Sequence, residues 1–152
     1  DPALRSAFLI GFLILFAFLG VFTYVNFHLV RHGFGLTMAE IGLIHVLFIP
    51  SVFTTPLSAR LTARLSYRVA LLLYLAIALA GLPLLLSDSI APVATGLCLI
   101  AIGTFAAQAA ATSFVGVAAR TNRTSASGFY LAAYYIGGLT GTALIGGLYD
   151  RL

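Results

Sequence analysis

The segment that decides the fold is residues 69–80, which read VALLLYLAIALA and continue without a charge as far as Ser87. Arg68 and Asp88 bound the apolar run. A helix needs about 20 apolar residues to cross the hydrocarbon core of a bilayer, and this run has about that length. It does not alternate between apolar and polar residues, as a strand of a membrane barrel does. The segment therefore predicts an α-helix that spans a membrane.

The composition extends this prediction to the whole chain. Of the 152 residues, 61% are hydrophobic and 8% are charged, and the mean hydropathy is +1.09. A soluble domain usually carries about 25% charged residues, so lipid rather than water is the expected solvent. The basic residues are all arginines, scattered between apolar runs. Because a nucleic-acid binder gathers its basic residues on one polar face, no nucleic-acid partner is expected.

Charged residues divide the chain into five apolar stretches, and each predicts one helix. A helix satisfies its own backbone hydrogen bonds, as lipid requires. We expect an all-α integral membrane protein with a single transmembrane domain over residues 1–152. The expected spans are residues 6–30, 41–59, 69–87, 91–117 and 125–149.

Two local patterns refine the second span. Thr37 and Glu40 have the spacing of a capping box, in which side chain and backbone of the two residues bond reciprocally at a helix start. Pro50 and Pro56 lie inside the span and predict a kinked helix, because proline has no N–H to donate.

Arginines at the ends of the spans predict the orientation, because cytoplasmic loops carry an excess of basic residues. One side holds Arg5, Arg60, Arg64, Arg68, Arg120 and Arg123, and the other holds Arg31 and Arg151. We therefore expect a multi-pass protein of the cell (inner) membrane, with a cytoplasmic N-terminus and a C-terminus outside.

The fourth span carries the most informative polar residues. Thr104, Gln108 and Thr112 recur at i, i+4 and i+8 and so share one face of a helix. Hydrocarbon cannot satisfy the donors and the acceptor of a glutamine amide. Gln108 therefore either bonds to a neighbouring helix or lines a water-filled cavity, and the sequence leaves both interpretations open.

Further candidates for a solute cavity lie in the other spans. Tyr24, Asn26 and His45 lie toward the outer side, and Asn26 needs a partner for its amide. His45 is either a proton-titrating group or a histidine bonded to a neighbouring helix. In the fifth span, Tyr134 is deep enough to contact a ligand.

The fifth span also carries a packing signal. Gly137, Gly138, Gly141 and Gly146 form small-xxx-small patterns, which usually mean that two helices approach closely. Tyr130, nearer the end of the span, is expected to be an interfacial anchor.

Residue types typical of a metal site, a cofactor site or an enzyme are scarce. Cys98 is the only cysteine, and it lies in an apolar run, so no multi-cysteine metal site is expected. No hydrolase, zinc-protease or phosphate-loop motif occurs. No carboxylate lies in the middle of a span. If transport is driven by protons, the coupling acid lies outside this chain or His45 replaces it. We expect no metal, no cofactor and no enzymatic activity.

The segment from Ala59 to Arg68 resembles a degenerate copy of the cytoplasmic loop signature of the major facilitator superfamily. Ala59 stands at the first glycine of that signature, Ala63 at its aspartate, Arg64 at the basic position, Ser66 at the second glycine and Arg68 at the last basic position. The stretch from Gly35 to Leu43 and the stretch from Tyr134 to Asp150 are also similar to parts of the family's C-terminal half.

This resemblance implies that the chain is five of the six helices of a C-terminal half, that is, a partial half bundle. It implies a secondary transporter that exports a small solute or drug by alternating access, with the first and fourth helices lining the cavity and the third facing lipid. Arg60, Arg64 and Arg68 would form a cytoplasmic gating loop. The implied partners are the bilayer, a small-molecule solute, a proton as candidate coupling ion, and a missing N-terminal half or a second copy.

One alternative from a different functional class stays open. The chain is then a non-transporting membrane subunit or scaffold, which binds partner helices through its small-residue stripes.

Overall fold

The computed structural model describes residues 2–31, 37–119, 122–149 and 151. In chain order its elements are α1 (Pro2–Arg31), α2 (Met38–Gly42), the 3₁₀-helix η1 (Leu43–Phe48), α3 (Ile49–Arg64), α4 (Tyr67–Gly81), the 3₁₀-helix η2 (Leu82–Leu86), α5 (Ile90–Ala118) and α6 (Arg123–Tyr149). The described residues contain no strand.

Five helical segments are long and apolar enough to cross a membrane. They are Pro2–Val30, Leu43–Arg64, Tyr67–Leu86, Ile90–Ala118 and Arg123–Leu148. The expected all-α membrane fold class with five spans is therefore confirmed.

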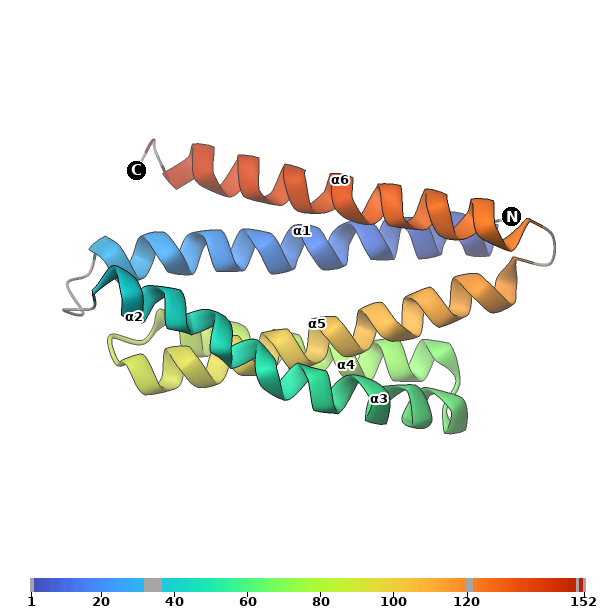
Figure 1. Ribbon diagram of the computed structural model, residues 1–152, viewed down its shortest axis with the longest axis horizontal. Coiled ribbons are helices and arrows are strands. Elements are labelled where there is room, and N and C mark those ends of the chain that lie inside the picture. Colours follow the sequence, from blue (N-terminus) through green and yellow to red (C-terminus); the bar gives the residue numbers. More distant parts are fainter. Residues whose placement is uncertain (1, 32–36, 120–121, 150, 152) are drawn as a thin grey trace.

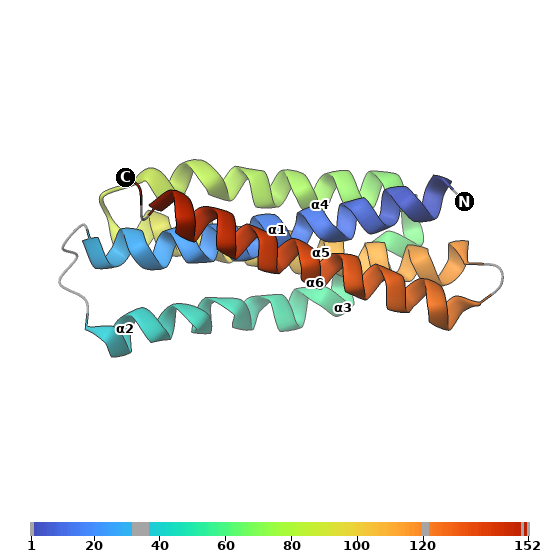
Figure 2. The same cartoon turned by 90° about the horizontal axis from the view of Figure 1, so that it is seen from above.

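The five spans form an elongated bundle (Figure 1). α1 packs chiefly against α6 and also against α5, whereas α5 also packs against α4 and α3. α3 and α4 lie on opposite sides of the bundle when it is seen from above (Figure 2). The N- and C-termini lie at opposite ends of the bundle (Figures 1 and 2), as an odd number of crossings requires.

Three glycines of α6 allow its backbone to approach α1. A Cβ atom at Gly137 or at Gly141 would overlap the backbone of Phe12 or Phe16, respectively. A Cβ atom at Gly138 would come within 2.7 Å of the Leu15 side chain. Gly146, which belongs to the same sequence pattern, has no described atom within 4 Å of an added Cβ. Among the glycines of this pattern, those in the middle of α6 therefore make the close contact with α1, and Gly146 does not.

α4 and α5 approach each other in a similar way. A Cβ atom at Gly81 would lie 2.5 Å from the carbonyl oxygen of Gly96, and one at Gly96 would lie 2.6 Å from that of Gly81. Gly103 lies against the backbone of Tyr74 and Ala78. The third span thus has one exposed side, because its other side is buried on α5.

The phenol of Tyr74 joins α4 to α3. Its hydroxyl donates to the carbonyl oxygen of Ser58 at 2.8 Å and lies 3.2 Å from the hydroxyl oxygen of Thr62. Tyr74, Ser58 and Thr62 are all buried. Tyr74, the one polar side chain in residues 69–80, therefore joins two helices by a hydrogen bond.

The second span differs from the single kinked helix expected over residues 41–59. It is built from η1 and α3, follows directly on α2, and continues to Arg64. Pro50 lies in the first turn of α3, where its missing N–H costs nothing, and Pro56 lies inside the helix. The change from 3₁₀ to α geometry at Phe48 and Ile49 thus comes directly before Pro50.

The capping box at the start of α2 is confirmed. The backbone N–H and the hydroxyl of Thr37 donate to Glu40 Oε2 at 2.7 and 2.8 Å. The backbone N–H of Glu40 donates to Thr37 Oγ1 at 3.3 Å. These bonds from Thr37 lower the pKa of the Glu40 carboxyl below its ordinary value of 4.5, and the bond from the Thr37 backbone has the largest effect.

We predict that the cap at Glu40 weakens in acid. Since the folded-state pKa is the lower one, the contribution to stability is complete above about pH 4.5 and is lost as the pH falls through the folded pKa. A carboxyl ¹³C NMR titration in micelles should give Glu40 a midpoint below that of an unstructured peptide of the same sequence. Thr37→Ala should move the midpoint upward, and equal midpoints in protein and peptide would contradict the prediction.

We also predict that Gly137→Leu destabilises the bundle while Gly146→Leu does not. The new side chain at Gly137 has to displace the backbone of Phe12, and overpacking typically costs about 1–3 kcal/mol. The midpoint of thermal unfolding in detergent micelles, followed by size-exclusion chromatography, should fall for Gly137→Leu alone. Equal midpoints in the two variants would show that α1 and α6 do not depend on this contact.

Candidate functional site

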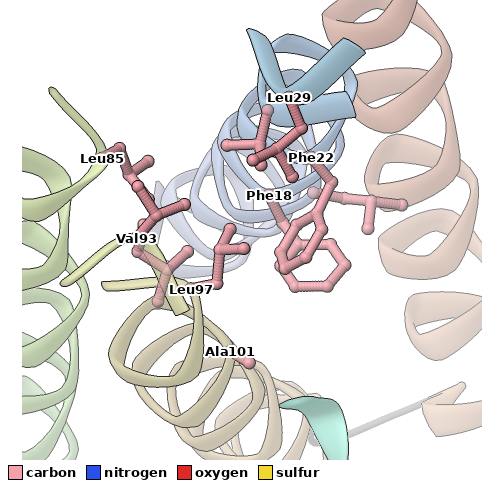
Figure 3. Packing of buried hydrophobic residues seen from close by; sticks show 10 residues of the cluster. Phe18, Phe22, Leu29, Leu85, Val93, Leu97 and Ala101 are labelled. Atoms are coloured by element: carbon pink, nitrogen blue, oxygen red, sulfur yellow. The ribbon is translucent and has the colours of Figure 1, made fainter. Parts of the chain in front are cut away.

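Four phenylalanines join α1, η1 and α5 in the interior of the bundle. The ring of Phe18 lies 4.7, 5.4 and 5.4 Å from those of Phe22, Phe48 and Phe105, measured between centroids. The rings of Phe22 and Phe48 are 4.6 Å apart, edge to face. Figure 3 shows Phe18 and Phe22 on α1 together with Leu97 and Val93 on α5. We call Phe18, Phe22, Phe48 and Phe105 the phenylalanine cluster.

A cavity of about 470 Å³ opens beside this cluster, between the second span and α5. Ligand pockets typically have volumes of about 300–1,000 Å³, so the cavity is large enough for a small solute. Its lining residues are His45, Phe48, Ile49, Ser51, Val52, Thr55, Pro56 and Phe105. Most of this wall is aliphatic or aromatic, and it contains no acidic residue and no arginine. We refer to it as the His45 cavity.

The polar groups of the His45 cavity are already engaged with their own backbone. The hydroxyls of Ser51 and Thr55 donate to the carbonyl oxygens of Phe48 and Ser51, each at 2.6 Å. His45 Nδ1 lies 3.1 Å from the carbonyl oxygen of Gly42, and its ring meets that of Phe48 edge to face at 5.5 Å. Since a carbonyl can only accept, this contact requires a proton on Nδ1, and in the neutral ring Nε2 is then an acceptor.

Gln108 is bonded across the bundle to α6. The hydroxyl of Tyr130 donates to Gln108 Oε1 at 2.5 Å. The ring of Tyr130 fills the space beside Gly11 of α1, where a Cβ atom would overlap it. Tyr130 is only 1% exposed. The prediction that Tyr130 is an interfacial anchor is therefore wrong: the ring lies in the bundle because Gly11 leaves room for it.

Thr104, Gln108 and Thr112 of α5 lie in different surroundings. Thr104 is buried and donates to the carbonyl oxygen of Ile100 at 2.6 Å, whereas Thr112 is exposed and donates to that of Gln108 at 2.9 Å. Both threonine hydroxyls thus satisfy themselves within α5. Gln108 reaches α6 through its bond to Tyr130, and the Thr112 side chain also meets the Tyr130 phenol.

Tyr134 lies near the phenylalanine cluster. It is partly buried, and with Ile14, Phe18, Thr104 and Phe105 it lines a small void of about 10 Å³. Its ring is stacked on that of Tyr130, with 6.4 Å between centroids. The structure thus brings Tyr134 close to Thr104 and Phe105.

Tyr24 and Asn26 are placed elsewhere. Tyr24 stacks on His28 at 5.6 Å and lines a cavity between α1 and η2, away from His45. Asn26 is partly buried on α1. The cavity candidates from the sequence therefore do not meet at one point.

Arg60, Arg64 and Arg68 flank a short connection. Arg60 and Arg64 lie in the last turns of α3, and Arg68 lies in the first turn of α4, whose start is capped by the Ser66 hydroxyl accepting from the N–H of Val69. The same end of the bundle holds the first turns of α1 and α6 (Figure 1), with Arg5 and Arg123. We call it the arginine-rich end.

The sequence analysis missed the phenylalanine cluster and Gly11. Phe18 and Phe22 follow each other at i, i+4, which was a signal for one helix face. Phe48 and Phe105 had no such signal, because their contact joins segments more than fifty residues apart. In the described part of the chain no group of three metal-ligating side chains occurs.

Comparison with known proteins relates the chain to transporters. It is 33% identical over 150 residues to the "Uncharacterized MFS-type transporter YybF" of Bacillus subtilis (strain 168), which covers 98% of this chain and 37% of that protein. It is 29% identical over 150 residues to the "Inner membrane transport protein YnfM" of Escherichia coli (strain K12), covering 98% of this chain and 36% of that protein.

A third relative is an "Uncharacterized transporter" of Buchnera aphidicola subsp. Baizongia pistaciae (strain Bp), 29% identical over 137 residues. That match covers 90% of this chain and 34% of the relative. The chain thus spans about a third of the length of the curated relatives it matches. No family model and no solved structure matches it.

We predict that Tyr130→Phe destabilises the bundle, because it removes the only side-chain bond from α6 to Gln108 among the described residues. Interhelical hydrogen bonds in membranes contribute about 0.6–1.7 kcal/mol, so the unfolding midpoint in micelles should fall measurably. Tyr135→Phe is the matched control, since its phenol is 61% exposed. An equal response of both variants would contradict a special role for the Tyr130 hydroxyl.

Proposed function

We propose that this chain, whose sequence is related over nearly its whole length to transporters including one of the MFS type, is part of a secondary active transporter of the major facilitator superfamily. The transporter moves a small solute out of the cell by alternating access. The observation that carries this proposal is the relationship itself: three relatives named as transporters match at least nine-tenths of the chain.

Two exposed helices support a larger assembly around the chain. In an 18-residue stretch of each span, 17% of the residues are buried in the span that contains α3, 17% in α6 and 22% in α4, against 50% in α5. α3 and α6 flank α5 and α1 on the two sides of the bundle (Figure 1). We propose that these two helices meet the second half of the transporter, either an N-terminal half or a second copy, and that α1 and α5 lie nearest the solute path.

The His45 cavity is the best-supported place for the solute. Its aromatic and aliphatic wall favours a neutral molecule, because a charge there would be desolvated with no opposite charge to pair with. Phe48 and Phe105 would stack on it, and His45 Nε2 would accept a hydrogen bond from it. Thr104, Gln108, Thr112 and Tyr134 would line the neighbouring part of the path, and Tyr24 and Asn26 its outer end.

The arginines also suggest an orientation in the membrane and a gating role. The arginine-rich end would face the cytoplasm of the inner membrane, with the N-terminus inside and the C-terminus outside. Arg60, Arg64 and Arg68 would contact the cytoplasmic ends of neighbouring helices when the halves rock. A proton is the proposed coupling ion.

Transport is tested with the protein expressed from its natural reading frame in cells that lack other efflux pumps, loaded with the neutral aromatic dye Nile red. We predict energy-dependent efflux above a vector control. Phe105→Ala should reduce it roughly tenfold, because losing a buried phenyl contact costs about 1.5–3 kcal/mol. Leu72→Ala is the control, since Leu72 is 61% exposed on α4, which the proposal places neither on the solute path nor against the second half.

Other results of this experiment would contradict individual parts of the proposed function. Net dye uptake would contradict export, and insensitivity to a protonophore would exclude the proton. Equal flux in Phe105→Ala and Leu72→Ala would contradict binding of the solute in the His45 cavity. Absence of flux above the control would contradict transport of neutral aromatic solutes and favour the scaffold alternative.

A further inference from the structure

A furrow separates α1 from α4 on the side of the bundle away from α3. The two helices scarcely touch each other, because both pack on α5. Three cavities follow the furrow, with volumes of about 480, 300 and 620 Å³. The first two share Ile10, and the second and third share Val21, Leu79 and Leu82. The furrow therefore continues from the arginine-rich end across the bundle.

The first cavity, at the arginine-rich end, has an apolar interior and a basic mouth. Small residues on two helices hold it open, among them Ala7 of α1 and Ala110 of α5. The ring of Tyr67 closes one side, edge to face with Phe114 at 5.5 Å. Arg68 and Ser6 stand at its rim and are exposed. We call it the Arg68 cavity.

Among the residues that the structure describes, charge at this end of the bundle is one-sided. Arg5, Arg60, Arg64, Arg68 and Arg123 lie there, at the helix ends named above. The acidic side chains Glu40 and Asp88 belong to connections at the opposite end. Within the described ranges no arginine is paired with a carboxylate. An anion that reaches the Arg68 guanidinium therefore has no described carboxylate to compete with.

A furrow that faces the hydrocarbon of a bilayer is filled, since an empty one forfeits dispersion contacts along both helices. Water does not fill it, because the wall beyond the mouth is apolar. A flexible acyl chain fits such a wall, and it is joined in a phospholipid to a phosphate at the depth of the helix ends. Basic pockets between membrane helices bind anionic headgroups in this way.

We propose that the Arg68 cavity binds one anionic phospholipid. Its phosphate pairs with the Arg68 guanidinium, with charge-assisted hydrogen bonds. One acyl chain lies between Ala3 of α1 and Leu71 of α4 and runs along the furrow past Ile10 toward Leu79. The Tyr67 phenol is placed to donate to the headgroup. A zwitterionic lipid binds less well, because its own cation is repelled by the arginine-rich end.

The test uses the purified protein expressed from its natural reading frame, in mild detergent with equal amounts of phosphatidylglycerol and phosphatidylcholine, analysed by native mass spectrometry. The wild type should retain phosphatidylglycerol in preference. Arg68→Ala should reduce its retention at least roughly fivefold, about 1 kcal/mol. Arg64→Ala removes the same charge from an exposed position outside the cavity and should retain the lipid.

A second variant tests the cavity apart from the charge. Ser6→Leu places a larger side chain at an exposed position of the rim and keeps every arginine, so it should reduce the retention of both lipids. Equal losses in Arg68→Ala and Arg64→Ala would overturn the proposal in favour of diffuse surface charge. Unchanged lipid retention in Ser6→Leu would also overturn the proposal. So would a wild type that shows no preference for phosphatidylglycerol, which is the result expected if another protein segment covers the furrow.

Discussion

The rule that every polar group inside a membrane needs a partner within the protein governs this structure. It makes each span a helix, and it decides where the hydroxyls point. Ser51, Thr55, Thr104 and Thr112 all donate to carbonyl oxygens of their own helix three or four residues back. Of these four hydroxyls, that of Thr112 also meets a neighbouring helix, at the Tyr130 phenol. The few polar side chains that reach across helices are therefore the ones that fix the arrangement.

Two such ties lie on different sides of the bundle. Tyr74 joins α4 to the carbonyl of Ser58 in α3, and Tyr130 joins α6 to Gln108 in α5. Between these ties, contact depends on how closely backbones approach, since lipid gives apolar side chains little reason to leave it. Glycines supply the approach where α6 meets α1 and where α4 meets α5. Residues without a side chain thus determine which helices become neighbours.

The candidate site results from this packing of the helices. α4 holds α5 on one side, and Phe105 of α5 meets Phe18 of α1 and Phe48 of η1 on the other. The wall of the His45 cavity forms where the second span changes from 3₁₀ to α geometry, directly before Pro50. Its chemistry is aromatic, with polar groups already bonded to the backbone. The furrow between α1 and α4 has the opposite character, since an arginine stands at its mouth. One bundle therefore carries one surface suited to a neutral solute and another suited to an anionic lipid.

The sequence by itself determined the membrane class, the five spans, the capping box at Thr37 and Glu40 and the resemblance to a transporter family, because these depend on hydropathy, local spacing and local hydrogen bonds. It also marked glycines of α6 as packing residues, but it could not tell Gly137 from Gly146, since only the tertiary structure decides which one meets α1. For the same reason Tyr130 looked like an anchor at the interface, and the phenylalanine cluster went unnoticed. Depth along a helix can be counted from the sequence, whereas the direction that a side chain faces depends on neighbours far away in the chain. Tertiary packing alone placed Tyr130 on Gly11 and Phe105 beside Phe48, because a close contact between helices needs both surfaces to be known.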